Sequence, residues 1–342
     1  FIGGNGANGI EIFSNANQNE IRQCVIGDAF STGASNGNHG VLITDNSMYN
    51  IVGANSLALG NTLVANTLYG VYITADSNAV MGNHIGVDGG GALLPNAEGI
   101  FGGNCSGLVI GKDWAGNGEG NVVSGHTYQG IFFSNVNNSI IAGNIVGANP
   151  SGNASIPNKI GILLQNSNNN QIGGEIILDQ GNLISGNGEY GLSVENSDGV
   201  EIYGNTIGLD ASGSVALTNF WSGINLEAST NAVIGQASNS NRRNLISGNN
   251  LSGLLINGGS GHVIAQNLIG TDAGGLNGIG AQDTGISIIN ANSVDVGGDY
   301  MQDRNVIVGN DEIGVSIHNS TSVDVHGNTI GNLTNYIQES GV

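Results

Sequence analysis

The sequence is poor in charged residues, above all in positively charged ones. Only six of its 342 residues are Lys or Arg, against 26 Asp and Glu, and the formal net charge is −20 at pH 7. A phosphate backbone is held mainly by clusters of Lys and Arg, and the densest basic window here is the pair Arg242 and Arg243. This scarcity of cations excludes nucleic acid as a partner and disfavours polyanionic sugars.

Cysteine and long apolar runs are also scarce. The two cysteines, Cys24 and Cys105, lie far apart with neither a CxxC motif nor a metal-ligand spacing. We therefore expect free thiols and no zinc site. No apolar run reaches membrane-spanning length, which predicts no membrane insertion. The chain begins with Phe1 and has no leader pattern ahead of it, so we expect a processed product or a segment of something longer.

Glycine and asparagine are abundant instead. The chain has 60 Gly, and Asn is nearly as frequent. Both residues tolerate the left-handed backbone of tight turns, so the chain is expected to turn often and regularly. Hydrophobic residues make up 39% of the sequence and charged residues 9%. That balance fits neither a disordered polyelectrolyte nor a helical globule.

Internal repetition is the strongest signal in the chain. Tetrapeptides that begin with Asn recur in two interleaved series, each with spacings of 60 to 62 residues. A second signature, Gly-apolar-x-apolar, recurs every 29 to 32 residues from Gly9 to Gly314. Two rungs therefore make one 61-residue superrepeat, and about eleven rungs are predicted. The asparagines of the two series are Asn61, Asn83, Asn121, Asn144, Asn182, Asn205, Asn244, Asn267, Asn305 and Asn328.

Each rung is expected to consist of short strands. Alternations of apolar and polar residues, such as Val71 to Thr74, have period two and predict half-buried strands. Strands that repeat in one direction predict an all-β protein, a right-handed single-stranded parallel β-helix, or β-solenoid. We expect one such domain over 1–342, with both ends uncapped. The residues predicted to fill its interior are Val41, Ile43, Ile73, Ile131, Phe133, Leu164, Val194, Leu226, Ile256, Ile288 and Ile317.

The repeated Asn has a structural explanation. At one corner of each rung, its side-chain amide can pass hydrogen bonds along the stack and satisfy polar groups that the turn would bury. A Gly precedes many of these asparagines, and we predict that it supplies a positive φ at the corner. These glycines are Gly60, Gly82, Gly143, Gly181, Gly204 and Gly327.

Every second rung carries longer loops. From the Asn corner to the next Gly signature the short rungs use 9 residues, whereas the long rungs use 16 to 18. A second extension occurs in the same rungs, at 112–119, 175–179, 236–243 and 299–304. Two ribs of protruding loops are therefore expected along the rod.

Residues 204–250 carry the most complete copy of the pattern. They contain Gly-Asn-Thr-Ile-Gly-Leu-Asp at 204–210, Gly-Ile-Asn-Leu at 223–226, Asn-Ala-Val-Ile-Gly at 231–235 and Asn-Leu-Ile-Ser-Gly-Asn at 244–249. Over essentially its full length the chain resembles the parallel β-helix repeat proteins secreted by bacteria. That resemblance implies a pectate-lyase-like solenoid. It also implies a part of a long surface protein, adhesin or appendage, and such repeats occur near carbohydrate-active enzymes as well.

Acidic residues follow the Asn corner on alternate rungs. Asp28, Asp88, Asn149, Asp210 and Asp272 are therefore about 9 to 10 Å apart along the axis, too far to share a metal ion or a proton tightly. We interpret them as Asx-turn residues. An exposed calcium site at Asp88, Asp210 or Asp272 is the alternative. The six histidines lie in different columns or distant rungs and form no evident ligand set.

One outward-facing column is apolar. The residue between the two buried positions of the Gly signature is Leu42, Tyr72, Phe101, Phe132 and Leu163 on five consecutive rungs, and it becomes polar at Ser193 and Asn225. Five such side chains make a stripe about 20 Å long. Three explanations are open: a loop rib covers the stripe, another protein chain contacts it, or glycan stacks on it.

We therefore expect a non-catalytic structural or adhesive module of an extracellular or cell-surface filament, stalk or appendage, without a cofactor. The expected partners are other protein chains or domains of the same assembly, with glycan as an alternative. A carbohydrate-active enzyme (polysaccharide lyase, hydrolase or epimerase) and a phage tail-fibre component remain open. Against an enzyme, the sequence shows neither clustered carboxylates nor a cationic subsite on one face.

Overall fold

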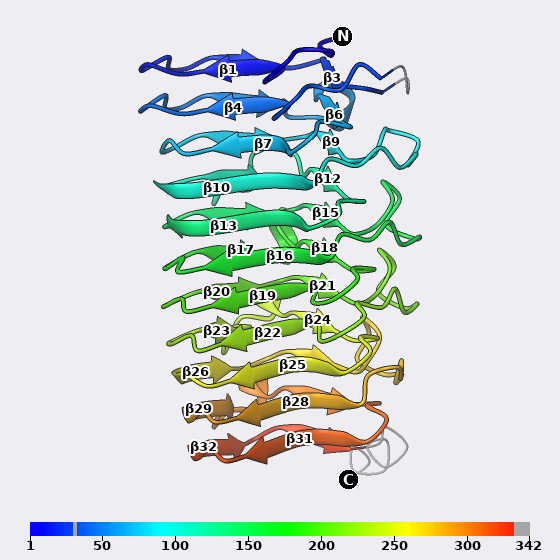
Figure 1. Ribbon diagram of the computed structural model, residues 1–342. Coiled ribbons are helices and arrows are strands. Elements are labelled where there is room, and N and C mark those ends of the chain that lie inside the picture. The colour runs from blue at the N-terminus through cyan, green and yellow to red at the C-terminus, as the bar shows by residue number, and fades with distance from the viewer. Residues whose placement is uncertain (30–32, 332–342) are drawn as a thin grey trace.

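The computed structural model describes residues 1–29 and 33–331, and the chain forms a right-handed parallel β-solenoid (Figure 1). Each rung gives one strand to each of three sheets, and every sheet has 11 strands in chain order. Neighbouring strands pair in parallel, as β7 does with β10 and β15 with β18. The predicted fold class and repeat are confirmed.

Sheet 1 carries the Gly signature. Its strands are β1 (Ile10–Ile12), β4 (Val41–Ile43), β7 (Tyr69–Ile73), β10 (Glu98–Ser106), β13 (Gln129–Asn137), β16 (Ile160–Gln165), β19 (Leu192–Glu195), β22 (Ile224–Glu227), β25 (Ser252–Asn257), β28 (Thr284–Ile289) and β31 (Ile313–His318).

Sheet 2 follows it in each rung. Its strands are β2 (Glu20–Ile21), β5 (Ile51–Gly53), β8 (Ala79–Met81), β11 (Val109–Gly111), β14 (Ile140–Ala142), β17 (Gln171–Gly173), β20 (Glu201–Tyr203), β23 (Val233–Ile234), β26 (Ser260–Ile264), β29 (Asn292–Gly297) and β32 (Thr321–His326).

Sheet 3 starts after the Asn corner. Its strands are β3 (Val25–Gly27), β6 (Thr62–Val64), β9 (His84–Ile85), β12 (Val122–Val123), β15 (Ile145–Val146), β18 (Leu183–Ile184), β21 (Thr206–Ile207), β24 (Leu245–Ile246), β27 (Leu268–Ile269), β30 (Val306–Val308) and β33 (Thr329–Gly331). The short 3-10 helices are η1 (Leu57–Leu59), η2 (Ile176–Leu178), η3 (Ser240–Arg242) and η4 (Met301–Asp303).

The interior of the rod is aliphatic, as predicted. Ten of the eleven residues assigned to it are fully buried, including Phe133 and Ile256. The prediction that Ile317, the eleventh of these residues, is buried is wrong, because its side chain is 49% exposed. Ile317 lies in β31, the last strand of sheet 1, which pairs with β28 on one side only within the described residues.

The predicted Asn ladder is present along its whole length. In each step the Nδ2 of one Asn donates to the Oδ1 of the next, from Asn61 to Asn83 at 2.9 Å through to Asn305 and Asn328 at 2.9 Å. The second hydrogen of the amide goes to a backbone carbonyl, as from Asn83 to Val52 O at 2.8 Å. A buried polar corner is thereby satisfied on every rung.

The prediction for the preceding glycines is correct at four positions and wrong at two. Gly82, Gly143, Gly204 and Gly327 have positive φ, between 66° and 72°. Gly60 has a φ of −74°, and Gly181 also lies outside the positive region. Both are needed for a different reason, since an added Cβ would lie 1.6 Å from Gly82 O at the first and 2.1 Å from Gly204 O at the second.

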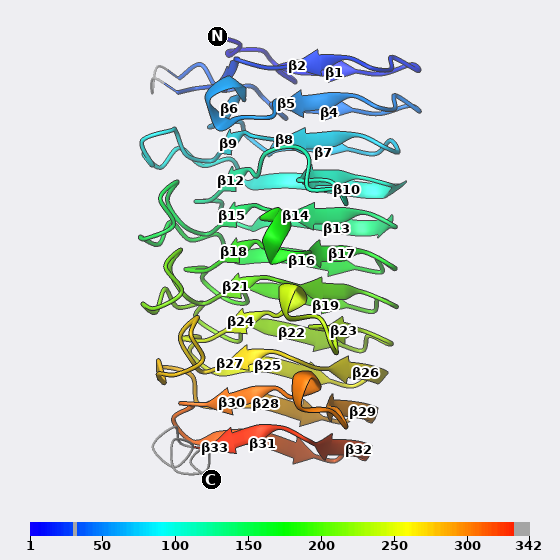
Figure 2. The same cartoon turned by 180° about the vertical axis from the view of Figure 1, so that it is seen from behind.

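The long loops form two continuous ribs, one along each border of sheet 3. Rib 1 leaves the rod between sheets 3 and 1, and its loops bond to each other two rungs apart, as from Ala211 N to Gly152 O at 2.8 Å. Rib 2 lies between sheets 2 and 3, where the helical turns of η2, η3 and η4 stand in one column (Figure 2). Its loops are joined by side chains, among them Lys112 Nζ to Asp179 Oδ2 at 2.7 Å.

Candidate functional site

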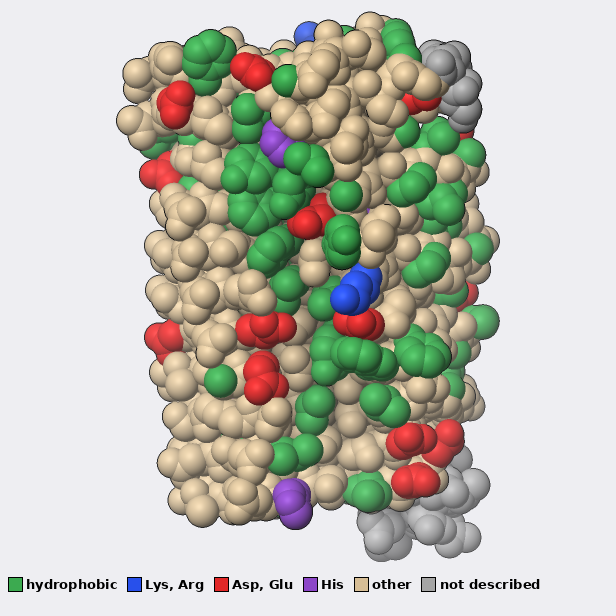
Figure 3. Space-filling model, viewed as in Figure 1, with side chains coloured by type: hydrophobic (Ala, Val, Ile, Leu, Met, Phe, Trp, Pro, Cys, Tyr) green, Lys and Arg blue, Asp and Glu red, His purple; other side chains and the backbone are tan. Residues whose placement is uncertain are grey.

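The apolar stripe lies in register on the outer face of sheet 1. Leu42 pairs with Tyr72, Tyr72 with Phe101, Phe101 with Phe132, and Phe132 with Leu163. The first four side chains are half-buried, whereas Leu163 is only 4% exposed. Figure 3 shows hydrophobic side chains gathered on this face over β4, β7, β10 and β13.

Neither rib covers the stripe in the described part of the chain. Rib 1 turns toward sheet 3 instead, where its Leu209 packs with Leu245 and Leu268 of β24 and β27. Rib 2 starts at the opposite border of sheet 3 (Figure 2). These described loops therefore give no support to shielding by a rib, and contact with another protein chain or with glycan stays a prediction.

A second aromatic column stands beside the stripe, and the sequence reasoning missed it. His39 and Tyr69 each precede the Gly of their signature and therefore stand three positions before a stripe residue, His39 before Leu42 and Tyr69 before Tyr72. The rings of Tyr72 and Phe101 stack with centroids 4.7 Å apart and planes 20° apart, and His39 stacks on Tyr72 at 4.8 Å. Tyr69 contacts both Tyr72 and Phe101. The residue before each signature Gly would have been the signal.

The stacking determines what the stripe offers to a partner. Parallel rings one rung apart cover each other's faces, so their edges point outward. Phe101 and Phe132 depart from this arrangement, with planes 73° apart. The ring of Tyr69 is also inclined, by 65° to Tyr72 and by 50° to Phe101. The stripe is thus a ridge of ring edges and aliphatic groups rather than a row of open ring faces.

Glu98 lies next to this ridge in an unusual protonation environment. It pairs with Tyr69 across β7 and β10, and its Oε2 is buried without a hydrogen-bond partner among the described residues. Burial raises the pKa of Glu98 to about 7, although the hydrogen bond with Tyr69 acts the other way. Burial, with the charge of Glu98, raises the pKa of Tyr69 to about 12. A carboxyl group that titrates near neutrality is a candidate general acid or base.

The carboxylates of the acidic residues after the corner accept hydrogen bonds from the backbone of their own loops. Asp88 Oδ1 accepts from Gly90 N at 2.9 Å and Ala92 N at 2.8 Å, and Asp272 Oδ1 accepts from Leu276 N at 3.0 Å. Burial acts to raise the pKa of Asp210, but hydrogen bonds from its loop, led by the Ser212 hydroxyl, leave it lowered. These contacts are the predicted Asx turns. Residues 1–29 and 33–331 contain no group of three or more His, Cys, Asp or Glu that could hold a metal ion.

Two histidines have structural positions inside the rod. His126 is 2% exposed, and its Nδ1 lies 3.3 Å from Asn96 O. Burial lowers the pKa of His126, and also of His262, to about 4. His318 and His326 lie on β31 and β32, in different sheets, as the sequence indicated. Both Cys24 and Cys105 are free.

His126 interrupts a second ladder that the sequence reasoning also missed. Nδ2 of Asn66 donates to Oδ1 of Asn96 at 2.9 Å, and Nδ2 of Asn158 donates to Oδ1 of Asn187 at 3.1 Å. A polar residue three or four positions before each signature Gly would have revealed this column. Its members are Asn5, Asn36, Asn66, Asn96, His126, Asn158, Asn187, Asn219, Asn249, Gln282 and Asn310.

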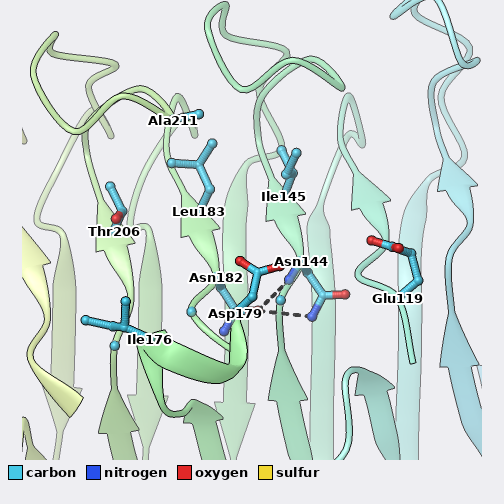
Figure 4. Close-up of a pocket in the computed structure, with 12 residues that line it drawn as sticks. Glu119, Asn144, Ile145, Ile176, Asp179, Asn182, Leu183, Thr206 and Ala211 are labelled. Atoms are coloured by element: carbon cyan, nitrogen blue, oxygen red, sulfur yellow. Dashed lines mark hydrogen bonds between the residues drawn. The ribbon is translucent and has the colours of Figure 1, made fainter. Parts of the chain in front are cut away.

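A pocket of about 480 Å³ opens on the far side of rib 1 from sheet 1, over sheet 3 (Figure 4). Its floor contains Ile145, Leu183 and Thr206, which are neighbours in the register of β15, β18 and β21. Ile176 and Asp179 of rib 2 line one side, and Ala211 of rib 1 and Glu119 also contribute. The sequence analysis placed Glu119, Ile176 and Asp179 in loop extensions, and Asn144 and Asn182 in the ladder, but it predicted no pocket.

Comparisons with known proteins give a fold but no family. Neither a family model nor a curated protein matches the sequence. The structure is similar to the periplasmic alginate epimerase AlgG, with a TM-score of 0.53, 15% identity, and coverage of 86% of this chain and 62% of that one. The chain thus spans less than two thirds of the epimerase. Such a likeness shows the right-handed β-helix fold alone.

Weaker similarities are found to two further proteins. The A-module of mannuronan C-5 epimerase AlgE6 from Azotobacter vinelandii has a TM-score of 0.45 at 11% identity, covering 94% of this chain and 78% of that one. The Dettilon tailspike protein gp208 has a TM-score of 0.34 at 14% identity, covering 91% of this chain and 61% of that one. Among the described residues, no helix is long and apolar enough to cross a membrane.

Proposed function

We propose that the chain is a non-catalytic rod of an extracellular assembly, and that it associates sideways with other chains of its kind through the outer face of sheet 1. The observation that carries this proposal is the apolar ridge of Leu42, Tyr72, Phe101 and Phe132, which no described loop covers. Monomeric soluble proteins seldom expose a continuous apolar strip, and in-register strands add the areas of successive side chains.

The construction of the rod supports a structural role. Amide ladders and a continuous aliphatic interior connect every rung to the next, so the surface of sheet 1 is held in a fixed register over its length. A rigid surface loses little conformational entropy when it binds. Such a rod is suited to repeated lateral contacts.

Ring geometry favours a protein partner over a sugar. Stacking of a sugar on an aromatic residue uses the face of the ring, and the faces of Tyr72 and Phe101 are turned toward each other at 4.7 Å. The exposed ring edges and aliphatic groups fit an apolar protein surface instead. The net charge of −20 opposes association of like chains at low salt, because the repulsion is screened only as ionic strength rises.

Sedimentation velocity tests this proposal. The wild-type chain should shift from monomer toward dimer or larger species between about 0.05 and 1 M NaCl, since salt shortens the Debye length and strengthens apolar association. The double variant Tyr72→Ser, Phe132→Ser should remain folded by circular dichroism yet stay monomeric. Phe13→Ser is the matched control, because Phe13 is 53% exposed directly after β1 and lies outside the stripe. A wild-type chain that is monomeric at every salt concentration would sink the proposal.

A carbohydrate-active enzyme is the second candidate, and Glu98 is the observation that favours it. A carboxyl with a pKa raised to about 7, beside the Tyr69 hydroxyl on an open sheet, has the protonation behaviour of a general acid or base. The alginate epimerase with the similar fold acts on a polysaccharide. Incubation with alginate, polygalacturonate and neutral glycans tests this candidate: turnover that Glu98→Gln abolishes would establish it, and no turnover would leave the structural function.

A further inference from the structure

Rib 2 exposes an apolar surface that is separate from the stripe. The three residues of η2, Ile176, Ile177 and Leu178, are 50%, 72% and 39% exposed. Trp114, in the preceding loop of the same rib, is 51% exposed. These are large side chains on a surface otherwise rich in Asn, Gly and Ser, and three consecutive exposed aliphatic residues are unusual in a loop that could have been polar.

This apolar loop is held in place rather than free. Lys112 Nζ bonds Asp179 Oδ2 at the end of η2 at 2.7 Å, and Gln180 Nε2 donates to Asp113 O at 2.6 Å. Asp179 itself adopts the left-handed conformation that ends the helix, with φ of 53°. The apolar side chains of η2 are therefore held in an exposed position by contacts within the rib.

The pocket over sheet 3 begins directly beside η2. Ile176 forms part of its wall, and Ile145 and Leu183 lie on its floor beside Thr206 (Figure 4). The pocket volume of about 480 Å³ leaves room for side chains of a partner. A convex apolar knob next to a concave floor with both apolar and polar groups is a shape that receives a short amphipathic segment of another chain.

The charges of the pocket are negative and only partly balanced. Glu119 and Asp179 line it, and the neighbouring cation, Lys112, is paired with Asp179. The Lys112 side chain is 12% exposed, so it is largely unavailable to a ligand. The Glu119 carboxylate forms no hydrogen bond or ion pair with any described residue; only its backbone carbonyl is used, by Gly82 N at 2.8 Å. An unpaired carboxylate at the end of this floor complements a cation.

We propose that this surface binds a basic amphipathic segment of a partner protein, with a Lys or Arg placed at Glu119 and flanking apolar side chains on Ile176, Ile177 and the pocket floor. The segment lies across rib 2, on a different face of the rod from the stripe. The proposal is therefore independent of lateral association, and either can fail without the other. The opposite charge of the segment and of this acidic chain would also speed their encounter.

A peptide array tests the proposal. The probes are 12-residue peptides with one central Lys or Arg between apolar residues, and matched sets carry Glu or norleucine in place of the cation. The full chain should bind members of the basic set and not their acidic counterparts, with an affinity that falls as salt rises. Hits are then measured in solution by fluorescence anisotropy of the labelled peptide.

Three variants locate the binding. Glu119→Gln and Ile177→Ser should each weaken binding about tenfold, because one removes the charge pair and the other an exposed apolar contact. Glu20→Gln is the control, since Glu20 is an exposed acidic residue on sheet 2, and it should change nothing. Asp179 is left intact because it holds Lys112.

Several results would overturn the proposal. One is equal binding of the basic and acidic peptides, and another is binding that Glu119→Gln and Ile177→Ser leave unchanged. Absence of binding by every basic peptide is a third. Binding of glucosamine oligomers in place of peptides would assign the pocket to a cationic sugar and reject a protein partner. Circular dichroism of each variant verifies that the rod is folded.

Discussion

Asn144 and Asn182 are joined by two hydrogen bonds to a single oxygen: Oδ1 of Asn182 accepts from Nδ2 of Asn144 at 3.0 Å and from its backbone N at 2.9 Å. Both asparagines are 1% exposed. Since both side chains are almost fully buried, a missing partner leaves polar atoms unsatisfied. Each such atom costs about 1 to 3 kcal/mol.

The ladder predicts a large cost for its interruption. Asn144→Ala should lower the free energy of unfolding by about 3 kcal/mol, because the neighbouring asparagines lose a donor and an acceptor in a buried corner. Urea denaturation followed by circular dichroism measures this change. Asn241→Ala is the control, as Asn241 is exposed in η3 and only its backbone N is bonded, to Asn239 Oδ1. Equal effects of the two substitutions would contradict a structural role for the ladder.

His126 predicts a loss of stability in acid. Its pKa is about 4 in the folded chain against an ordinary 6.5, because burial disfavours the charged ring. The unfolded chain therefore takes up the proton first, and stability that is complete above pH 6.5 is lost as the pH falls toward 4, by about 3 kcal/mol in total.

His126→Asn tests this directly. The new amide should continue the second ladder between Asn96 and Asn158 and remove one titrating group. Thermal unfolding should then differ little from wild type at pH 8 but occur at a higher temperature at pH 5. A variant with the same dependence on pH as the wild type would show that His126 does not cause the acid sensitivity.

Neighbouring positions of β25 test the direction of the side chains. Ile256 is fully buried and Leu255 is half-buried on the outer face. Ile256→Asp places a carboxylate in the aliphatic interior and should cost several kcal/mol, unfolding the adjacent rungs. Leu255→Asp should cost about 1 kcal/mol or less. Comparable melting temperatures for the two variants would contradict the assignment of the interior face.

Glu98 predicts the opposite dependence on pH from His126. Its folded-state pKa of about 7 lies above the ordinary value of 4.5, so the unfolded chain ionises first. The stability that the neutral form contributes is present below pH 4.5 and is lost as the pH rises to 7. Glu98→Gln should therefore raise the melting temperature at pH 8 and leave it nearly unchanged at pH 4. No difference at either pH would mean that Glu98 is well solvated.

The sequence was sufficient to predict the fold because each rung repeats the same pattern of interior, outward and corner positions. Ile73 and Ile131 could be assigned to the interior from period two alone, and the corner of Asn83 from its recurrence. Side-chain contacts between rungs were harder to predict. Gly60 and Gly82 both precede a ladder Asn, yet one is required by a close backbone contact and the other by its φ.

The sites beyond the stripe depend on distant rungs. Lys112 contacts Asp179, 67 residues later in the sequence, because successive loops of rib 2 lie against each other. The repeat does not predict which residue types occupy these loop positions. The pocket beside Glu119 arises from the same contact. The repeat would have allowed His39 to be placed near Tyr72. The residue type at this position, one before the signature Gly, changes from rung to rung, so the aromatic column was not recognised.

Cross-linking in the associated state tests the central claim, that chains meet through the outer face of sheet 1. Two added cysteines are compared in a Cys24→Ser background, in which the remaining Cys105 is only 5% exposed. They are Ser134→Cys, on β13 next to Phe132 and Phe133, and Glu201→Cys, on β20 of sheet 2. With a short bismaleimide at high salt, the account predicts covalent dimers from Ser134→Cys and almost none from Glu201→Cys. Dimers that form through Glu201→Cys alone, or equally through both positions, would contradict it.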